Sequence, residues 1–214
     1  MQMSKIKAPL SAGKLTQTDD FSTIVQDEGG EQLCIRGIRA EDGIFAKMDF
    51  VSCRFEHCRF YKCDFSQSCF SDCLFRNCDF SGCRFDSAWF ERCEWHGCKA
   101  AGTSFIQSHW NNQRCSGSVM QIANFDGAIF NRVIFQNSDL RDSYFSKCSM
   151  KAAAFDKSNL AQANFFGTPL AGLDFSTSRF TGIALSRNGE ELKGAAVSGE
   201  QAAELVSFLG VTVK

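Results

Sequence analysis

The stretch CRFEHCRFYKCDFSQSCFSDCLFRNCDFSGCRFDSAWF, residues 53–90, places a phenylalanine at every fifth position. The same register runs from Ile35 to Leu185 and gives 31 consecutive centres without a slip. Of the 22 phenylalanines in the chain, 19 fall on it. A second series, two residues before each centre, holds small residues such as Cys53 and Cys73. The repeating unit is therefore five residues long and reads small–x–large–x–x.

This period excludes a straight strand. Residues two apart point to the same side of an extended chain, but a step of five changes the side, so the chain must turn within every unit. The cysteines at the small position are interrupted at Ser68 and Ala88, which indicates a period of twenty and thus four sides per coil. We predict an all-β solenoid of between seven and eight coils. Its core should contain Phe55, Phe75, Trp95, Phe135, Cys53, Cys73 and Cys93. Each buried phenylalanine should contribute about 1.5–3 kcal/mol.

Several units resemble a known family. The pentads CDFSQ (63–67), CDFSG (78–82), ANFDG (123–127), SNLAQ (158–162) and ANFFG (163–167) match the A(D/N)LxX consensus of pentapeptide-repeat proteins. The resemblance implies a right-handed quadrilateral parallel β-helix, which we place at residues 33–187.

The two ends depart from the repeat. Residues 1–32 are acidic and lack reliable pentads, which predicts an irregular N-terminal cap. Residues 188–214 form a C-terminal cap, in which Ser198 and Gln201 read as a capping box that opens a helix at about 199–209. Gly210 suits the position after the helix, and residues 211–213 read as a short strand. The apolar stripe of this helix is Leu205, Val206, Phe208 and Leu209. It either covers the last coil, joins two copies of the chain, or does both.

The ending VSGEQAAELVSFLGVTVK, residues 197–214, is similar to the C-termini of the Qnr-type proteins, which confer quinolone resistance, and of their relatives that confer immunity to microcin or albicidin. In that subfamily the terminal element joins two rods tail to tail, and the cytoplasmic dimer binds bacterial type II topoisomerases. The resemblance implies a homodimer and a topoisomerase partner. We expect no direct binding of nucleic acid or membrane, because the net charge is −1 and Lys and Arg are interleaved with acids without forming a basic stripe.

One stretch keeps the five-residue spacing but lacks the small and large residue types of the repeat. Residues 107–117, QSHWNNQRCSG, are polar around one large apolar residue. Either the coil tolerates poor pentads here, or a loop projects from it. Because Qnr-type proteins carry projecting loops that matter to their action, His109, Trp110 and Arg114 are candidate contact residues.

Nothing in the sequence predicts catalysis, a metal or a cofactor. The cysteine spacing is CxxxxC, which is the repeat itself, and His57 and His96 fall on outward or corner positions. No run reaches the roughly 18 apolar residues of a spanning helix, and the first residues do not read as a signal peptide. We therefore expect a cytoplasmic protein with reduced cysteines.

The charge departs from the subfamily's usual mechanism. An acidic rod that mimics DNA needs a strong negative field. Residues 35–185 instead carry 15 acidic and 17 basic side chains, a net charge of +2. Two functions stay open. The first is protection of a topoisomerase from a poison. The second is a scaffold for an unidentified protein, which an exposed patch at Trp89, Tyr61 or Tyr144 would favour.

Overall fold

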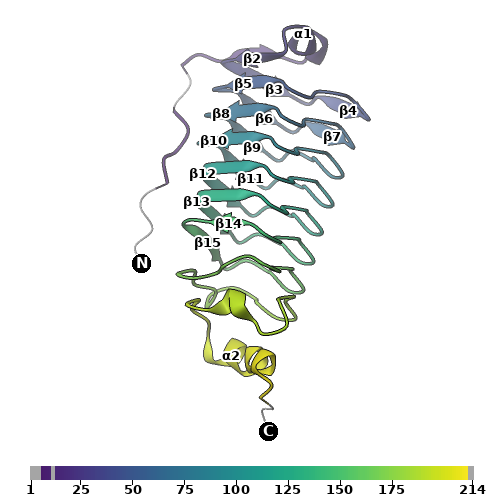
Figure 1. Ribbon diagram of the computed structural model, residues 1–214. Coiled ribbons are helices and arrows are strands. Elements are labelled where there is room, and N and C mark those ends of the chain that lie inside the picture. Colours follow the sequence, from purple (N-terminus) through teal and green to yellow (C-terminus); the bar gives the residue numbers. More distant parts are fainter. Residues whose placement is uncertain (1–5, 11–12, 212–214) are drawn as a thin grey trace.

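The computed structural model describes residues 6–10 and 13–211. The chain forms one column of stacked coils with a helix at each end (Figure 1). The strands pair in parallel with partners twenty residues apart, as Phe55 with Phe75 and Trp95 with Cys115. Four pentads thus complete one coil, and the predicted all-β solenoid is confirmed.

The four sides of the rod follow one another along the chain. Side 1 holds the pentads centred on Phe50, Phe70 and Phe90, and sides 2, 3 and 4 are centred on residues 55, 60 and 65 in the first full coil. Side 1 contains β2 (Gly29–Glu31), β5 (Asp49–Val51), β8 (Cys69–Ser71), β10 (Trp89–Glu91) and β14 (Ser149–Met150). Side 2 contains β1 (Thr16–Thr18), β3 (Leu33–Arg36), β6 (Arg54–Glu56), β9 (Leu74–Arg76), β11 (Glu94–His96) and β15 (Ala153–Asp156). Both β12 (His109–Ser116) and β13 (Ile129–Gln136) run through sides 1 and 2, and side 3 contains β4 (Arg39–Glu41) and β7 (Arg59–Tyr61). Side 4 is held by single parallel bridges such as Tyr144–Asn164.

The interior consists of stacked rings beside small hydrogen-bond donors. Phe50 lies over Phe70 with ring centroids 5.1 Å apart and planes 9° from parallel. The thiol of Cys73 reaches the carbonyl oxygen of Phe50, 23 residues earlier, at 3.4 Å. The Ser158 hydroxyl donates in the same way to Phe135 at 3.1 Å. The small position therefore requires a short side chain, and most of the Cys, Ser and Thr side chains found there also donate to a carbonyl of the coil before.

The corners recur two residues after each centre. The backbone there is left-handed, with φ of 56° at Asp72, 51° at Arg92 and 53° at Asn112. Glycine is favoured in this region, since other residues lose roughly 1–2 kcal/mol in it. Most corners of this chain nevertheless carry a side chain, so stacking and strand pairing must offset that strain.

Residues 107–117 do not project. They enter β12, which pairs with β10 and β11 on one edge and with β13 on the other. Trp110 is 1% exposed, and its ring lies 4.9 Å from that of Phe90 and 5.1 Å from that of Phe105. The indole therefore continues the aromatic core, and the coil runs on through this stretch despite its poor pentads.

The N-terminal cap is more regular than the predicted irregular segment. Helix α1 (Phe21–Gln26) begins at Asp20, whose carboxylate accepts a hydrogen bond from the Ser22 backbone N–H at 2.9 Å. The ring of Phe21 packs edge-on against Phe45 at 4.9 Å. The cap therefore closes the first coil with an aromatic contact of the kind that fills the core.

The C-terminal cap begins where the period changes. The partner of Asp174 is Ala196, 22 residues later, because the coil carries a two-residue insertion and the 3₁₀ turn η1 (Glu190–Leu192). Helix α2 (Gly199–Leu205) continues as the 3₁₀ turn η2 (Val206–Leu209). Ser198 and Gln201 form the capping box, and Gly210 is left-handed with φ of 72°. The predicted strand at 211–213 lies largely outside the described residues.

Candidate functional site

The described residues offer no site for metal-dependent chemistry. Within 6–10 and 13–211, no three His, Cys, Asp or Glu side chains are placed to hold a metal ion. The same ranges hold no helix long and apolar enough to cross a membrane. The repeated cysteines point inward, and burial raises the pKa of Cys148 to about 12. These buried thiols pack within the core of the rod.

The three predicted contact residues lie on β12 and are not equivalent. Trp110 belongs to the core. Arg114 is half-buried on side 2, beside its strand partners Glu94 and Ile134. His109 is half-buried on side 1, where its ring stacks on that of Trp89 with centroids 4.7 Å apart. Of the three, only His109 lies in an aromatic surface contact.

Trp89 is the exposed member of this pair. Its side chain is 42% exposed, whereas Trp95 and Trp110 are buried. The other two aromatic residues predicted to be outward are also exposed, Tyr61 on side 3 and Tyr144 on side 4. Lys62 places its ammonium group 5.0 Å from the Tyr61 ring centroid, so that aromatic already has a cation partner. Trp89 and Tyr144 are therefore the freer aromatic groups.

The edge between sides 1 and 2 is fixed by a polar ladder. Arg92 donates from Nε and Nη2 to the two carboxylate oxygens of Asp72, at 2.7 and 2.8 Å. Burial alone would raise the pKa of Asp72, but the hydrogen bond from Arg92 holds it below its usual value. Asn112 accepts from Arg132 Nε at 2.8 Å and donates to Glu91 at 3.1 Å. The backbone N–H of Leu10 also donates to Asp72, which lays residues 6–10 along this edge.

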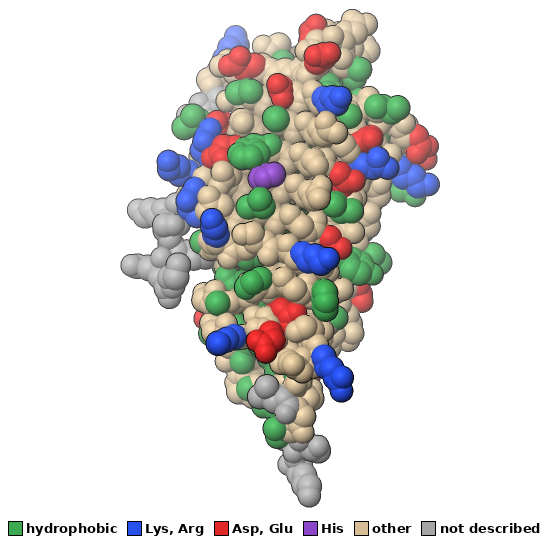
Figure 2. Space-filling model, in the orientation of Figure 1, with side chains coloured by type: hydrophobic (Ala, Val, Ile, Leu, Met, Phe, Trp, Pro, Cys, Tyr) green, Lys and Arg blue, Asp and Glu red, His purple; other side chains and the backbone are tan. Residues whose placement is uncertain are grey.

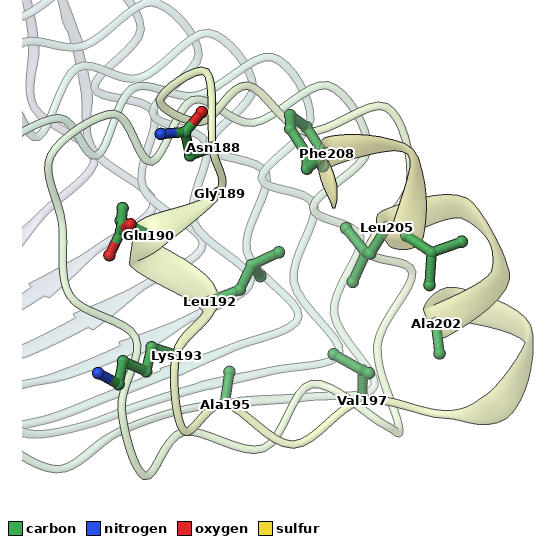
Figure 3. Close-up of a pocket in the computed structure, with 11 residues that line it drawn as sticks. Asn188, Gly189, Glu190, Leu192, Lys193, Ala195, Val197, Ala202, Leu205 and Phe208 are labelled. Atoms are coloured by element: carbon green, nitrogen blue, oxygen red, sulfur yellow. The ribbon is translucent and has the colours of Figure 1, made fainter. Parts of the chain in front are cut away.

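A groove lies at the C-terminal end of the rod. It encloses about 390 Å³ between η1 and the α2–η2 helix. Figure 3 shows Leu192, Leu205 and Phe208 directed into the space between these two helical turns. Leu205 is buried, Val206 and Phe208 are half-buried, and the side chain of Leu209 lies outside the described part of the chain. The predicted apolar stripe thus both covers the last coil and leaves an apolar groove open.

The charged surface is mixed. Figure 2 shows basic and acidic side chains scattered over the visible face, with no continuous acidic stretch and with a histidine against a large hydrophobic group. Most ion pairs join neighbouring coils or neighbouring positions, as Arg36 with Glu56 and Arg141 with Asp139. This arrangement agrees with the nearly neutral body counted from the sequence.

Some surface residues could not be identified from pentad positions alone. Ile129 is 39% exposed and Phe166 is 50% exposed. Each looks like an ordinary outward residue in the sequence. When the chain is written in rows of twenty residues, Ile129 falls in one column with His109 and Trp89. This alignment would have predicted that the three side chains lie side by side.

Comparison with protein families identifies the repeat. The family described as "Pentapeptide repeat region" matches residues 88–165, and "Pentapeptide repeats (9 copies)" matches residues 50–94. No curated protein sequence matches the chain.

Solved structures share the fold. A trypsin-treated variant of QnrB1, a plasmid-mediated fluoroquinolone resistance protein, is 20% identical with a TM-score of 0.56, covering 86% of this chain and all of that one. A second trypsin-treated QnrB1 variant is 22% identical with a TM-score of 0.53, over 85% of this chain and 90% of its own. HetL, from the cyanobacterium Nostoc sp. strain PCC 7120, is involved in regulating heterocyst differentiation. It is 15% identical with a TM-score of 0.56, over 85% of this chain and 94% of its own. The unbroken five-residue register, the four-sided coil and the family matches agree, and the chain belongs to the pentapeptide-repeat proteins.

Proposed function

We propose that the protein is a non-enzymatic rod that binds a bacterial type II topoisomerase, DNA gyrase or topoisomerase IV, in the cytoplasm and protects it from quinolone-type or peptide poisons. The observation that carries this proposal is the likeness to trypsin-treated QnrB1, which covers all of that chain and 86% of this one. The Qnr-like ending at residues 197–214 adds to it.

The mode of binding must differ from imitation of DNA. The repeat body has a net charge of +2, so it lacks the field that would draw it into a DNA-binding groove. Recognition then depends on exposed side chains on particular sides of the rod. Such contacts would act on the enzyme's protein surface and leave the DNA path accessible.

Supercoiling by purified gyrase tests the proposal. Relaxed plasmid and gyrase are combined with ciprofloxacin at the concentration that halves supercoiling, and the protein is titrated in. Restored supercoiling at protein concentrations that leave drug-free gyrase unaffected is the expected result. If no concentration restores activity, or if the protein only inhibits, the topoisomerase proposal fails.

Dimerisation through the C-terminal groove is part of the same proposal. Leu192, Val206 and Phe208 form an apolar lining. Contact with the same end of a second copy of the chain would remove this lining from water, which is favourable for apolar side chains. Val206→Asp should convert a dimer to a monomer in sedimentation velocity, because it places a charge in the contact. Ala203→Asp, on the exposed face of the same helix, is the matched control. Equal behaviour of both variants would contradict this interface.

A second candidate function is a scaffold for a different protein. The exposed Trp89, stacked on His109, favours it because large aromatic groups are typical anchors of protein interfaces. If supercoiling shows no protection, this function becomes the better one.

A further inference from the structure

The exposed apolar side chains of the rod are concentrated on two neighbouring sides. Among the described residues of the repeat body, eight large hydrophobic side chains are exposed, and six of them lie on sides 1 and 4. Side 1 carries Val51, Trp89 and Ile129, and side 4 carries Ile44, Tyr144 and Phe166. No such residue lies on side 2. Because sides 4 and 1 share an edge, they form one continuous surface, which we call the 1–4 surface.

The centre of the 1–4 surface is an aromatic column. Trp89, His109 and Ile129 occupy the same position on β10, β12 and β13, which pair in register. Strands in a sheet lie ~4.8 Å apart, so the three side chains form a short unbroken row. The Trp89 and His109 rings are 19° from parallel, which holds the indole in one orientation. A fixed aromatic group binds a partner with little loss of side-chain entropy.

A hollow lies on the shared edge beside this column. It has a volume of about 430 Å³ and is bounded by Ile106 at one end and Phe166 at the other. Gly127 lies between them at a left-handed corner, with φ of 70°, and has no side chain to fill the space. The rest of the lining is polar and consists of Gln107, Asp126, Ser146 and Lys147. A partner's aliphatic or aromatic side chain would find apolar groups at the two ends of the hollow, with one cation and one carboxylate between them.

The charges around the centre of this surface are mainly positive. Between Trp89 and Phe166, sides 1 and 4 carry four basic side chains, Arg92, Arg132, Lys147 and Lys151, and two acidic ones, Glu91 and Asp126. Lys147, Lys151 and Arg132 are in no ion pair with any described acidic group within 4.0 Å. Glu91 accepts from Arg92 at 3.0 Å, whereas Asp126 accepts from the Ser146 backbone N–H at 2.9 Å and has no described cation within 4.0 Å. The surface therefore combines an apolar centre with a basic rim.

We infer that the part of the 1–4 surface between Trp89 and Phe166 is the contact site for an acidic protein surface that carries aliphatic or aromatic side chains. A second copy of the chain does not fit. Two-fold pairing would place this surface against itself and bring Lys147 and Lys151 against the same cations. The surface spans two sides and about four coils, and a stable contact needs roughly 800 Å² per partner, more than one narrow side can offer. The identity of the partner rests on the proposed function, whereas the acidic and apolar chemistry of the partner does not.

Charge reversal tests the inference with a matched control. Lys147→Glu/Lys151→Glu alters the rim, and Arg76→Glu/Lys157→Glu makes the same change in charge at exposed residues of side 2. Trp89→Ala removes the centre, and Tyr61→Ala removes an exposed aromatic group from side 3. All four variants change outward side chains, so circular dichroism should show unchanged folding.

The probe is a fluorescein-labelled random copolymer of glutamate and tyrosine, followed by anisotropy in about 0.1 M salt. We expect the K147E/K151E and W89A proteins to bind about tenfold more weakly, which corresponds to about 1.4 kcal/mol of binding free energy. The two control variants should bind as the unmodified protein does. Because Trp95 and Trp110 are buried, a shift in tryptophan emission on binding would locate the contact at Trp89. Equal binding of a lysine–tyrosine copolymer, tighter binding of a thymidine 30-mer, or equal losses in the control variants would each overturn the inference.

Gyrase binding separates the two proposals. If the acidic copolymer binds through the 1–4 surface but gyrase does not bind, the surface stands and the topoisomerase function fails. If gyrase is protected equally by the K147E/K151E and unmodified proteins, the function stands and this surface is not its contact site.

Discussion

The side-chain amide of Gln201 donates a hydrogen bond to the backbone carbonyl oxygen of Phe175, 3.0 Å away. In earlier coils the carbonyl oxygen of a centre accepts from a thiol or hydroxyl 23 residues later at most positions where that residue is Cys, Ser or Thr, as Phe50 does from Cys73. The last coil has no successor to supply that donor. Gln201 supplies it, and also donates to the Ser178 carbonyl at 2.7 Å. Helix α2 therefore closes the rod through polar groups as well as apolar ones.

Gln201→Ala should lower the free energy of unfolding by about 1–3 kcal/mol, because the carbonyl oxygens of Phe175 and Ser178 each lose a buried hydrogen bond. Urea denaturation measures the change. Glu200→Ala, at an exposed position of the same helix, should change the free energy by no more than about 0.5 kcal/mol. Similar losses in both variants would show that the helix contributes only through its intrinsic stability.

Trp110→Ala should destabilise the protein by about 3–5 kcal/mol, because it opens a cavity in the core. Trp89→Ala should change stability by about 0.5 kcal/mol at most, since its side chain is 42% exposed. Thermal unfolding distinguishes them. A mild effect of Trp110→Ala would mean that residues 107–117 are not packed as part of the coil.

Deletion of residues 109–128 should give a folded, shorter rod, because it removes one full period of twenty and keeps every column aligned. Deletion of residues 109–113 should disrupt the fold, since each later pentad would move to the neighbouring side. Circular dichroism and cooperative melting measure both. If the five-residue deletion folds as well as the twenty-residue one, the columns do not control the register.

Native protein should react with Ellman's reagent at Cys69, while the other eleven cysteines, which are buried, should react only after unfolding. Partial burial and a hydrogen bond to Asp49 raise the pKa of Cys69, so its reaction should begin at higher pH than that of an ordinary thiol. Asp49→Asn should move the onset to lower pH by removing the neighbouring negative charge. Rapid reaction of several thiols in the native state would contradict the buried columns.

Glu191→Gln should reduce stability at neutral pH more than at acidic pH. Burial would raise the pKa of Glu191, but hydrogen bonds from Gly167 and Ser186 hold it below its usual value of 4.5. A carboxylate with a lowered pKa stabilises the fold above its unfolded value, and this stabilisation is lost as the pH falls through the folded value. Unfolding free energies of both proteins between pH 7 and pH 3 should therefore converge at low pH. A difference that is constant across this range would contradict the assignment.

Several features of the fold followed from residue spacing alone. The phenylalanines at every fifth position require a corner in each unit, and the interrupted cysteine series predicts four units per coil. Ser198 and Gln201 predicted the start of α2 from local hydrogen bonding. The regularity of the N-terminal cap could not be predicted in this way, because α1 is fixed by the contact of Phe21 with Phe45, which joins segments 24 residues apart.

The sequence by itself determined the period, the direction of the large side chains and the nearly neutral charge of the body, because these depend on residue type and on spacing along the chain. The tertiary structure decided which outward residues meet. Trp89 and His109 are twenty residues apart, and only the register of β10 with β12 brings their rings to 4.7 Å. It also decided that residues 107–117 stay in the coil, which keeps Trp110 inside, because β12 pairs with β10 and β11 on one edge and with β13 on the other. Surfaces of a solenoid arise between coils, so a single repeat contains too little information to define them.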